Sequence, residues 1–214
     1  ARVPRLRAGD ELVRSAGDGH EAGATLAAVP RDTADAAISA VRPIDRESPL
    51  HVTLLQGLSS GDRMDYTLQK AVELGVSAIV PVATQRSVVR LDRERADKRQ
   101  AHWRQILIGA CEQSGRNRIP EVLPVVSLPA ALAGVTAARR FVLSFEGGAR
   151  VRELEAPAGP IALLAGPEGG LTADEERLAH DAWFAPLSLG PRVLRTETAA
   201  VAALAAMQAV WGDG

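Results

Sequence analysis

Hydrophobic and polar positions alternate along most of the chain in a regular order. From residue 51 onward, short apolar runs of strand length alternate with segments whose apolar residues recur every three or four positions. The runs predict buried strands, and the longer segments predict amphipathic helices. The expected strands are His51–Leu55, Ala78–Val82, Phe141–Ser144, Ile161–Ala165 and Pro186–Leu189, and the expected helices span 62–74, 92–111, 172–183 and 198–211. This alternation implies an α/β fold with a mainly parallel sheet covered on both faces.

The first forty residues follow a different pattern. Short apolar pieces, such as Glu11–Val13 and Ala24–Val29, are separated by glycine-containing turns, which predicts short antiparallel strands. We therefore expect part of a small β domain over residues 1–44 and an α/β domain over residues 45–214. Because the chain starts at Ala1 without a methionine, we also expect that a residue or a longer piece precedes it.

The last expected helix, Thr198–Trp211, is apolar nearly all round. Such a helix must be buried on every side. A symmetric dimer achieves this, since small alanine residues allow helices to approach closely. The alternative is a central helix buried within one subunit.

Composition limits the classes of function. The 214 residues are 46% hydrophobic and 24% charged, as in globular proteins, and no apolar stretch is long enough to span a bilayer. A net charge of −1 disfavours indiscriminate nucleic-acid binding but allows a local basic face. The single cysteine, Cys111, excludes an internal disulfide and fits a reducing cytoplasm.

Metal and covalent chemistry find no support in the sequence. The four histidines, His20, His51, His102 and His180, lack ligand spacing, and one cysteine cannot form a thiolate cluster. The Gly-x-Ser-x-Gly nucleophile elbow is absent. We therefore expect no metal and no covalent intermediate.

Two glycine-bearing segments near the end of the chain carry the functional signal. Gly166-Pro-Glu-Gly-Gly170 leaves an expected strand and enters a helix that begins with the capping-box pair Thr172 and Glu175. A second segment, residues 187–198, leaves the next strand and enters the last helix. Such pairs of loops build ligand pockets in α/β sheets. Gly166–Gly170 has neither the P-loop nor the dinucleotide pattern, and an ordinary strand-to-helix turn is its alternative interpretation.

These segments resemble the SPOUT class of RNA methyltransferases. The resemblance rests on five motifs in order: Lys70-Ala-Val-Glu-Leu-Gly75; Arg86-Ser87; Glu112-Gln-Ser-Gly-Arg116 with Pro120; Gly166–Gly170 with Glu175; and Leu189-Gly190 with Leu194-Arg195-x-Glu197-Thr198-Ala199. It covers residues 50 to 211. Within that class, the motifs are similar to the bacterial family that methylates N3 of a uridine in small-subunit (16S) ribosomal RNA. Residues 1–44 resemble that family's PUA-like β-barrel, cut short at the front.

The resemblance implies several properties that spacing alone does not give. The fold would contain a C-terminal trefoil knot, the protein would be a homodimer through its C-terminal helix, and the methyl donor would be S-adenosylmethionine. The cofactor would contact residues of both glycine-bearing segments and of the strands before them. These residues are Leu164, Gly166, Pro167, Glu168, Gly169, Gly170, Leu187, Leu189, Gly190, Leu194 and Thr198.

Catalysis would require alignment of the donor with N3 and stabilisation of an anionic base. Arg195 is the candidate cation, and Glu197 or Glu168 is the candidate to take the proton or orient a water. Each has a structural alternative. Arg195 is equally interpretable as a helix-entry residue paired with Glu197, and contact with the cofactor or loop bracing fits Glu168 better than base catalysis.

Arg86, Gln113 and Arg116 are the candidates for holding RNA, either free or in the assembled subunit. Other functions remain open at this point. One is methylation of another RNA or of a ribose 2′-hydroxyl, and another is a non-catalytic RNA-binding assembly factor that keeps the pocket. A nucleotide-binding protein of another kind is disfavoured because both phosphate motifs are missing.

Overall fold

The computed structural model describes residues 6–29, 33–87, 93–145 and 147–214. The chain divides into two compact units, one formed by residues 1–47 with 111–119 and the other by residues 48–110 with 120–214. The first division lies three residues beyond the expected one, at 44/45. The inclusion of residues 111–119 in the first unit is not apparent from the sequence, because a unit built from two separated segments has no local signal.

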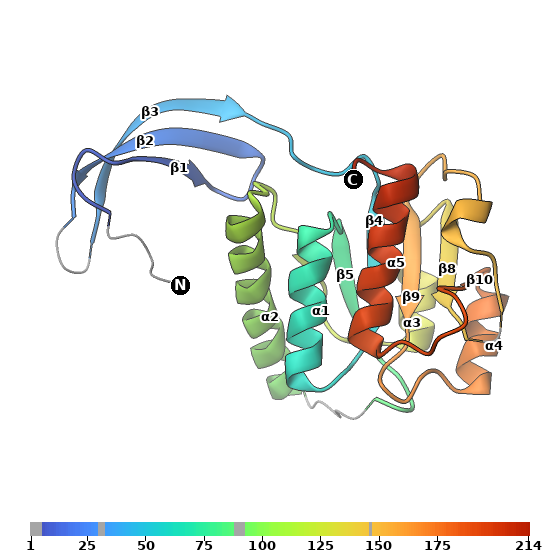
Figure 1. Cartoon of the computed structure of the whole chain (residues 1–214). Helices are drawn as coiled ribbons and strands as arrows, with labels where there is room; N and C mark the ends of the chain where they lie inside the picture. Colours follow the sequence, from blue (N-terminus) through green and yellow to red (C-terminus); the bar gives the residue numbers. More distant parts are fainter. Residues whose placement is uncertain (1–5, 30–32, 88–92, 146) are drawn as a thin grey trace. The chain divides into compact units, whose positions relative to one another are not determined.

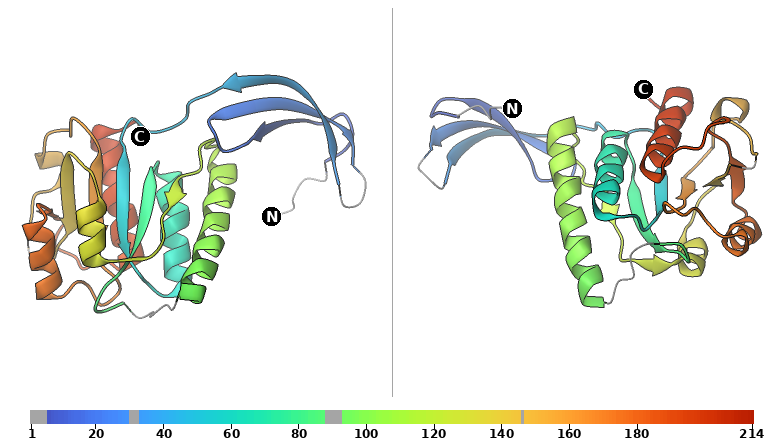
Figure 2. Two further views of the ribbon diagram at one scale, coloured as in Figure 1. Left: turned by 180° about the vertical axis from the view of Figure 1, so that it is seen from behind. Right: turned by 60° about the horizontal axis from the view of Figure 1, so that its bottom comes forward.

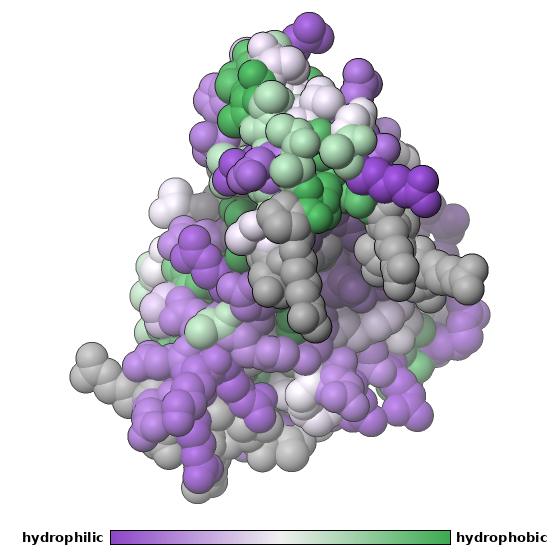
Figure 3. Space-filling view, turned by 90° about the vertical axis from the view of Figure 1, so that its left-hand side faces the viewer, coloured by the Kyte–Doolittle hydropathy of each residue, from purple (hydrophilic) through white to green (hydrophobic). Residues whose placement is uncertain are grey.

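The first unit contains a three-stranded antiparallel sheet in the order β1-β2-β3. Its strands are β1 (Glu11–Ser15), β2 (His20–Ala28) and β3 (Asp35–Pro43). The antiparallel strands expected in this region are therefore present. Much of the sheet is exposed, including the apolar side chains of Val13, Ile38 and Val41. Figure 3 shows green side chains among purple ones in the upper part of its view.

The second unit contains a seven-stranded sheet in the order β10-β8-β9-β4-β5-β6, with β7 also paired to β5 (Figure 1). Its strands are β4 (Val52–Gly57), β5 (Ala78–Ala83), β6 (Glu121–Val122), β7 (Val126–Ser127), β8 (Arg139–Leu143), β9 (Ile161–Ala165) and β10 (Ala185–Leu187). The described strand pairs of this sheet are all parallel. The expected parallel α/β sheet is confirmed.

Helices cover both faces of this sheet (Figures 1 and 2). The helices are α1 (Gly61–Glu73), α2 (Arg93–Ser114), α3 (Leu128–Gly134), α4 (Ala173–Asp181) and α5 (Thr196–Trp211), with a 3₁₀ turn, η1 (Val151–Glu153). α1 and α5 pack together on one face, with α2 beside α1, while α3 and α4 lie on the other. The expected start of the second helix, Asp92, lies outside the described residues.

The core explains why these segments fold as they do. Every residue of β9 is buried, as a strand between two helical layers requires. On the α1 side, Met64 and Leu68 are fully buried. On the other face, Leu55, Leu164 and Phe184 belong to one buried cluster with α3 and α4. Burial on both faces fixes β4 and β9 as the centre of the sheet.

The last helix is covered on one side only by this chain. Thr196, Ala200, Ala203, Leu204, Met207 and Gln208 are buried. Ala205 and Ala206 are half-buried, and Val210 is 47% exposed. The apolar helix is therefore not enclosed within one subunit, and a partly exposed apolar face runs along its length.

Candidate active site

The candidate site lies where four neighbouring parallel strands end. Register pairs Gln56 with Ala165, and Leu187 with Leu143. Because parallel strands run in one direction, the ends of β4, β8, β9 and β10 reach the same edge of the sheet. This edge is where α/β proteins bind ligands. We call residues 166–170, after β9, the first loop, and residues 188–195, after β10, the second loop.

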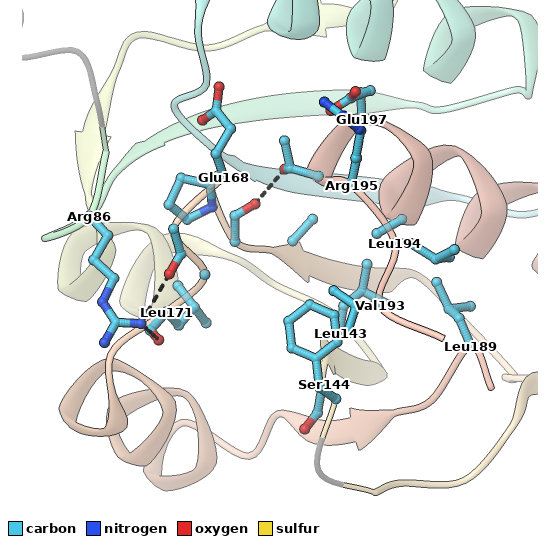
Figure 4. Close-up of a pocket in the computed structure, with 18 of the residues that line it drawn as sticks. Arg86, Leu143, Ser144, Glu168, Leu171, Leu189, Val193, Leu194, Arg195 and Glu197 are labelled. Carbon is cyan, nitrogen blue, oxygen red and sulfur yellow. Dashed lines mark hydrogen bonds between the residues drawn. The ribbon is translucent and has the colours of Figure 1, made fainter. Parts of the chain in front are cut away.

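The two loops line one pocket of about 640 Å³. Its lining residues are Arg63, Arg86, Leu143, Ser144, Phe145, Ala165, Gly166, Pro167, Glu168, Gly169, Gly170, Leu171, Ala173, Glu176, Leu187, Leu189, Gly190, Arg192, Val193, Leu194, Arg195, Thr196, Glu197 and Ala199. Figure 4 shows Glu168, Arg195 and Glu197 at one end, and Leu143, Leu189 and Val193 along the rest. The pocket thus combines an apolar wall with a charged end, and its volume suits a small organic ligand.

Hydrogen bonds of charged side chains attach the first loop to neighbouring segments. Arg86 Nη1 donates to the carbonyl oxygens of Gly169 at 3.0 Å and Leu171 at 3.1 Å (Figure 4). Glu168 Oε1 accepts from the Ser60 backbone N–H at 2.8 Å and from Arg63 Nη1 at 3.2 Å. These bonds attach the loop to the segments that follow β5 and β4.

The protonation of Glu168 follows from these contacts. Burial alone would raise the pKa of Glu168, but the Ser60 N–H and the Arg63 guanidinium outweigh this effect and hold it below its ordinary value. Glu168 is therefore a carboxylate at neutral pH and a weak proton acceptor. This arrangement favours loop bracing over base catalysis for Glu168.

The helix after the first loop begins as the sequence predicts. Thr172 Oγ1 accepts from the Glu175 N–H at 3.2 Å, while Glu175 Oε2 accepts from the Thr172 N–H at 2.9 Å. The capping box is confirmed. The second carboxylate oxygen of Glu175 accepts from the Gln85 N–H at 2.7 Å. One buried carboxylate therefore caps α4 and fixes the segment that carries Arg86.

Arg63 joins the first loop to the start of α5 electrostatically. It binds Glu168 in the first loop, and its Nε lies 3.9 Å from Glu197 Oε2 in the first turn of α5. The longer distance is an ion pair without a hydrogen bond. Glu168 Oε2 and Glu197 Oε2 are buried and have no hydrogen-bond partner among the described residues. Glu197 thus pairs with Arg63, and the pairing of Arg195 with Glu197, which was the structural alternative for Arg195, is not among the ion pairs that the described residues form.

The second loop is more exposed. Ser188 N–H donates to the Ala149 carbonyl at 3.0 Å, and Gly190 N–H donates to Ser188 Oγ at 3.3 Å. Beyond Gly190, Arg192 and Arg195 are exposed and Val193 is 79% exposed. Arg195 occupies the N-cap position of α5 without a side-chain cap bond. Its guanidinium lies at the charged end of the pocket (Figure 4).

The structure brings most of the expected cofactor residues together. Gly166, Pro167, Glu168, Gly169, Gly170, Leu187, Leu189, Gly190 and Leu194 all line the pocket. Leu164 does not line it, because its side chain faces the core cluster behind β9. Thr198 is also outside the lining, as an exposed residue of α5. The expected catalytic pair, Arg195 and Glu197, lines the charged end.

The three expected RNA-binding residues lie in different surroundings. Arg86 lines the pocket and binds carbonyl groups around the first loop. Gln113 is exposed near the end of α2. The Arg116 side chain is only 6% exposed and forms an ion pair with Glu47 within the first unit. Arg116 can reach RNA only if that ion pair opens, so its position favours a structural role.

Several lining residues were not expected from the sequence. Leu143, Ser144 and Phe145 follow β8, and their position at the carboxyl end of an expected parallel strand was an available signal. Arg63 and Thr196 had no such signal. Arg63 occupies the first turn of an ordinary amphipathic helix, and its partners are more than 100 residues away in the sequence.

Metal-binding clusters and membrane-spanning helices are both absent from the part of the chain that the structure describes. Residues 6–29, 33–87, 93–145 and 147–214 contain no group of three or more histidine, cysteine, aspartate or glutamate residues placed to hold a metal ion. No described helix is both long enough and apolar enough to cross a membrane.

Comparison with known proteins identifies the family. A family model described as an RNA methyltransferase domain matches residues 46–208. The chain is also 36% identical over 215 residues to the ribosomal RNA small subunit methyltransferase E of Bacillus subtilis, with 96% of this chain and 84% of that protein covered. The chain belongs to this RNA methyltransferase family. The Mycobacterium bovis protein of the same name is 34% identical over 213 residues, with coverages of 97% and 81%.

Solved structures agree with this assignment. The ribosomal RNA small subunit methyltransferase E of Neisseria gonorrhoeae, bound to S-adenosyl methionine, has a TM-score of 0.90 and 44% identity, covering 97% of this chain and 86% of that chain. A Legionella pneumophila methyltransferase in complex with the cofactor SAM has a TM-score of 0.93 and 40% identity, with coverages of 98% and 86%. The similarity therefore extends over both units.

Proposed function

We propose that this protein transfers a methyl group from S-adenosylmethionine to N3 of a uridine in small-subunit (16S) ribosomal RNA. The observation that carries the proposal is the single pocket formed by the two loops, in a chain whose relatives include small-subunit methyltransferases and structures bound to S-adenosylmethionine. A ribosomal RNA substrate would place the enzyme in the cytoplasm.

The pocket fits the proposed cofactor in size and chemistry. Its volume of about 640 Å³ lies within the usual range for ligand pockets. Leu143, Leu187 and Leu189 offer apolar contacts for an adenine ring, and exposed loop backbone offers hydrogen-bonding groups for its edge. When bound, the cofactor would supply an activated methyl group on a sulfonium, so the protein's main task is alignment.

The charged end of the pocket is the proposed acceptor side. Arg195 would stabilise negative charge on the base as N3 loses its proton. Glu197, which lines the same end of the pocket, would take that proton or orient a water that does. Arg63 would hold Glu197 in place. Glu168 would brace the first loop rather than act as a base.

Base analysis tests the reaction directly. Purified protein is incubated with S-adenosylmethionine carrying a labelled methyl group and with either 16S RNA or assembled small subunits from a strain that lacks the enzyme. Nuclease digestion and mass spectrometry then identify the product. The proposal predicts labelled 3-methyluridine at one site. Label on a ribose 2′-hydroxyl or on another base contradicts the assignment of N3, and absence of label with both substrates contradicts the reaction.

We further propose that the protein is a homodimer through α5. The support is the apolar face that this chain leaves partly exposed, which contains Ala205, Ala206 and Val210. Sedimentation should give twice the chain mass, and Ala205→Glu should give the monomer. Ala101→Glu, on the exposed face of α2, is the control and should leave the dimer intact. A wild-type monomer at micromolar concentration contradicts the proposal.

Two architectural expectations join the proposal. A PUA-like barrel is supported by the three antiparallel strands of the first unit. A trefoil knot is supported by the path of the chain near the site. β10 pairs with β8 at the sheet edge, whereas α5, which begins after the second loop, packs against α1 and β9.

Gln113 is the exposed candidate for RNA contact on the first unit.

A further inference from the structure

A buried chain of hydrogen bonds connects the first loop to the start of α5. Gln56, which is fully buried at the end of β4, donates from Nε2 to Thr196 Oγ1 at 3.3 Å. Thr196, which is 9% exposed, donates from Oγ1 to the Gly166 carbonyl at 2.6 Å. Neither Gln56 nor Thr196 was a candidate from the sequence. Three segments that are far apart in the sequence thus meet through two side chains.

The groups at the two ends of this series of hydrogen bonds decide which atoms donate and which accept. Gln56 Nε2 also donates to the Gly57 carbonyl at 3.1 Å, so the amide nitrogen must face this side. The Thr196 hydroxyl has one hydrogen, and because the Gly166 carbonyl can only accept, that hydrogen points to Gly166. The order is therefore Gln56 to Thr196 to Gly166. Removal of the hydroxyl would leave a donor and an acceptor unpaired together.

Two features beside these hydrogen bonds lack the partners that such groups usually have. Thr196 lies in the first turn of α5 and its hydroxyl bonds to the first loop, while the N-cap residue Arg195 makes no side-chain cap bond. Gln56 Oε1 is buried without a partner among the described residues, which is a cost that an apolar side chain would avoid. A buried polar group that is only partly satisfied calls for an explanation beyond packing.

The neighbouring backbone shows how closely the first loop rests on β4. A Cβ atom added to Gly57 would lie 2.5 Å from the Pro167 nitrogen and 2.8 Å from the Gly166 carbonyl carbon. The Gly166–Pro167 peptide therefore contacts the end of β4 on one side and is bonded to Thr196 on the other. Its orientation decides where the first loop presents its backbone to the pocket.

We propose that Gln56 and Thr196 are positioning residues that hold the Gly166–Pro167 peptide in the orientation that cofactor binding requires. They act through Gly166 and not on the reacting atoms. The inference rests on the proposed use of S-adenosylmethionine. It assigns to the end of β4 a part in the site that neither loop motif reveals.

A pair of variants at one position tests this inference. Thr196→Val removes the hydroxyl and keeps the shape of the side chain, whereas Thr196→Ser keeps the hydroxyl. For Thr196→Val, calorimetry should show S-adenosylmethionine binding weakened about tenfold to a hundredfold, since two buried groups lose their partner. Its KM for RNA should change less than about twofold, and Thr196→Ser should bind the cofactor within about threefold of the wild type.

A purely structural role makes a different prediction. Thr196→Val would then lower the melting temperature while the folded protein bound S-adenosylmethionine as the wild type does, and that result would overturn the inference alone. Failure of the wild type to bind S-adenosylmethionine would instead overturn the proposed function, and the inference with it. The two failures are therefore distinguishable.

A double-mutant cycle tests whether Gln56 acts on the first loop through Thr196. Gln56→Met removes the amide donor with little change in length. If Gln56 acts through Thr196, the loss of cofactor affinity in Gln56→Met/Thr196→Val should be clearly smaller than the sum of the two single losses. Additive losses of cofactor affinity would show that Gln56 does not act through Thr196. If Gln56→Met does not fold, the comparison of Thr196→Val with Thr196→Ser decides the outcome.

Discussion

The two loops of the pocket are held in different ways. The first loop is bonded along its length, through Gly166 to Thr196, through Glu168 to Ser60 and Arg63, and through Gly169 to Arg86. The second loop is bonded near its start, through Ser188 to Ala149 and through Gly190 to Ser188, and beyond that Arg192, Val193 and Arg195 are exposed. One half of the pocket is braced from several elements, and the other half is attached mainly where it begins.

This difference suggests a division of labour between the loops. A braced loop presents its backbone in one geometry before the ligand arrives, which reduces the entropy lost on binding. An exposed loop with few bonds opens locally at low free-energy cost and can close over a ligand. We infer that the first loop sets the position of the cofactor, and that the second loop completes the site and carries the catalytic cation.

The largest expected effect is on the second loop. Arg195→Ala should lower kcat by about 10²–10³-fold, because it removes a cation from the place where charge would develop. The dissociation constant for S-adenosylmethionine should change less than about threefold. Steady-state kinetics and calorimetry measure the two quantities, and Arg195→Lys should restore part of the rate. Equal losses in rate and affinity would contradict the catalytic role.

The next effect concerns the contact between the first loop and the end of β4. Gly57→Ala places a methyl group against the Pro167 nitrogen, and backbone cannot move aside as a flexible side chain does. We expect a loss of about 1–3 kcal/mol in the free energy of unfolding and a loss of about tenfold or more in cofactor affinity. Gly61→Ala is the control, since nothing lies within 4 Å of its added Cβ. Similar behaviour of the two variants would show that the first loop is not seated on β4.

A smaller effect distinguishes bracing from RNA contact at Arg86. Arg86→Met keeps the length of the side chain but removes its bonds to Gly169 and Leu171. If Arg86 mainly braces the first loop, affinity for S-adenosylmethionine should fall about tenfold while affinity for RNA changes little. Arg104→Met, on the exposed face of α2, is the matched control. Loss of RNA affinity with normal cofactor binding would restore the RNA-contact interpretation.

The smallest expected effect is a pH dependence of stability. Since the pKa of Glu168 is lowered in the folded protein, its ionised form stabilises the fold above the unfolded-state pKa of about 4.3. That contribution is lost as pH falls through the lowered folded-state pKa. The difference in unfolding free energy between the wild type and Glu168→Gln should therefore narrow below about pH 4.3. Denaturant unfolding measures it, with the exposed Glu155→Gln as control. A constant difference from pH 7 to acid would refute the bracing charge.

The sequence was most informative where signals are local. The strand Ile161–Ala165 and the capping box of Thr172 with Glu175 are written in neighbouring residues, and both are present in the structure. The short β6 and β7 strands and α3 had no periodic pattern long enough to detect.

Contacts between distant segments account for what the sequence did not reveal. Leu164 is an apolar residue of the kind expected beside a cofactor. Its strand is buried on both faces, however, and its side chain faces the core cluster formed with α3 and α4. Arg116 is a residue type that often contacts RNA, but its side chain forms an ion pair with Glu47, 69 residues earlier in the sequence. Arg63 and Gln56 each bond to a residue more than 100 positions away, and Thr196 connects Gln56 to Gly166, 30 residues before it. Residue type and spacing identified the loops but not the residues from other segments that hold the loops in place.

The central claim is that both loops bind one S-adenosylmethionine molecule between them. Hydrogen exchange of the wild-type protein, measured with and without S-adenosylmethionine, tests it most directly. We expect slower exchange in residues 166–170 and in residues 188–195. The decrease in exchange rate should be larger in the second loop, because that loop has fewer hydrogen bonds before the cofactor binds. Unchanged exchange in both loops, or protection confined to another part of the chain, would contradict it.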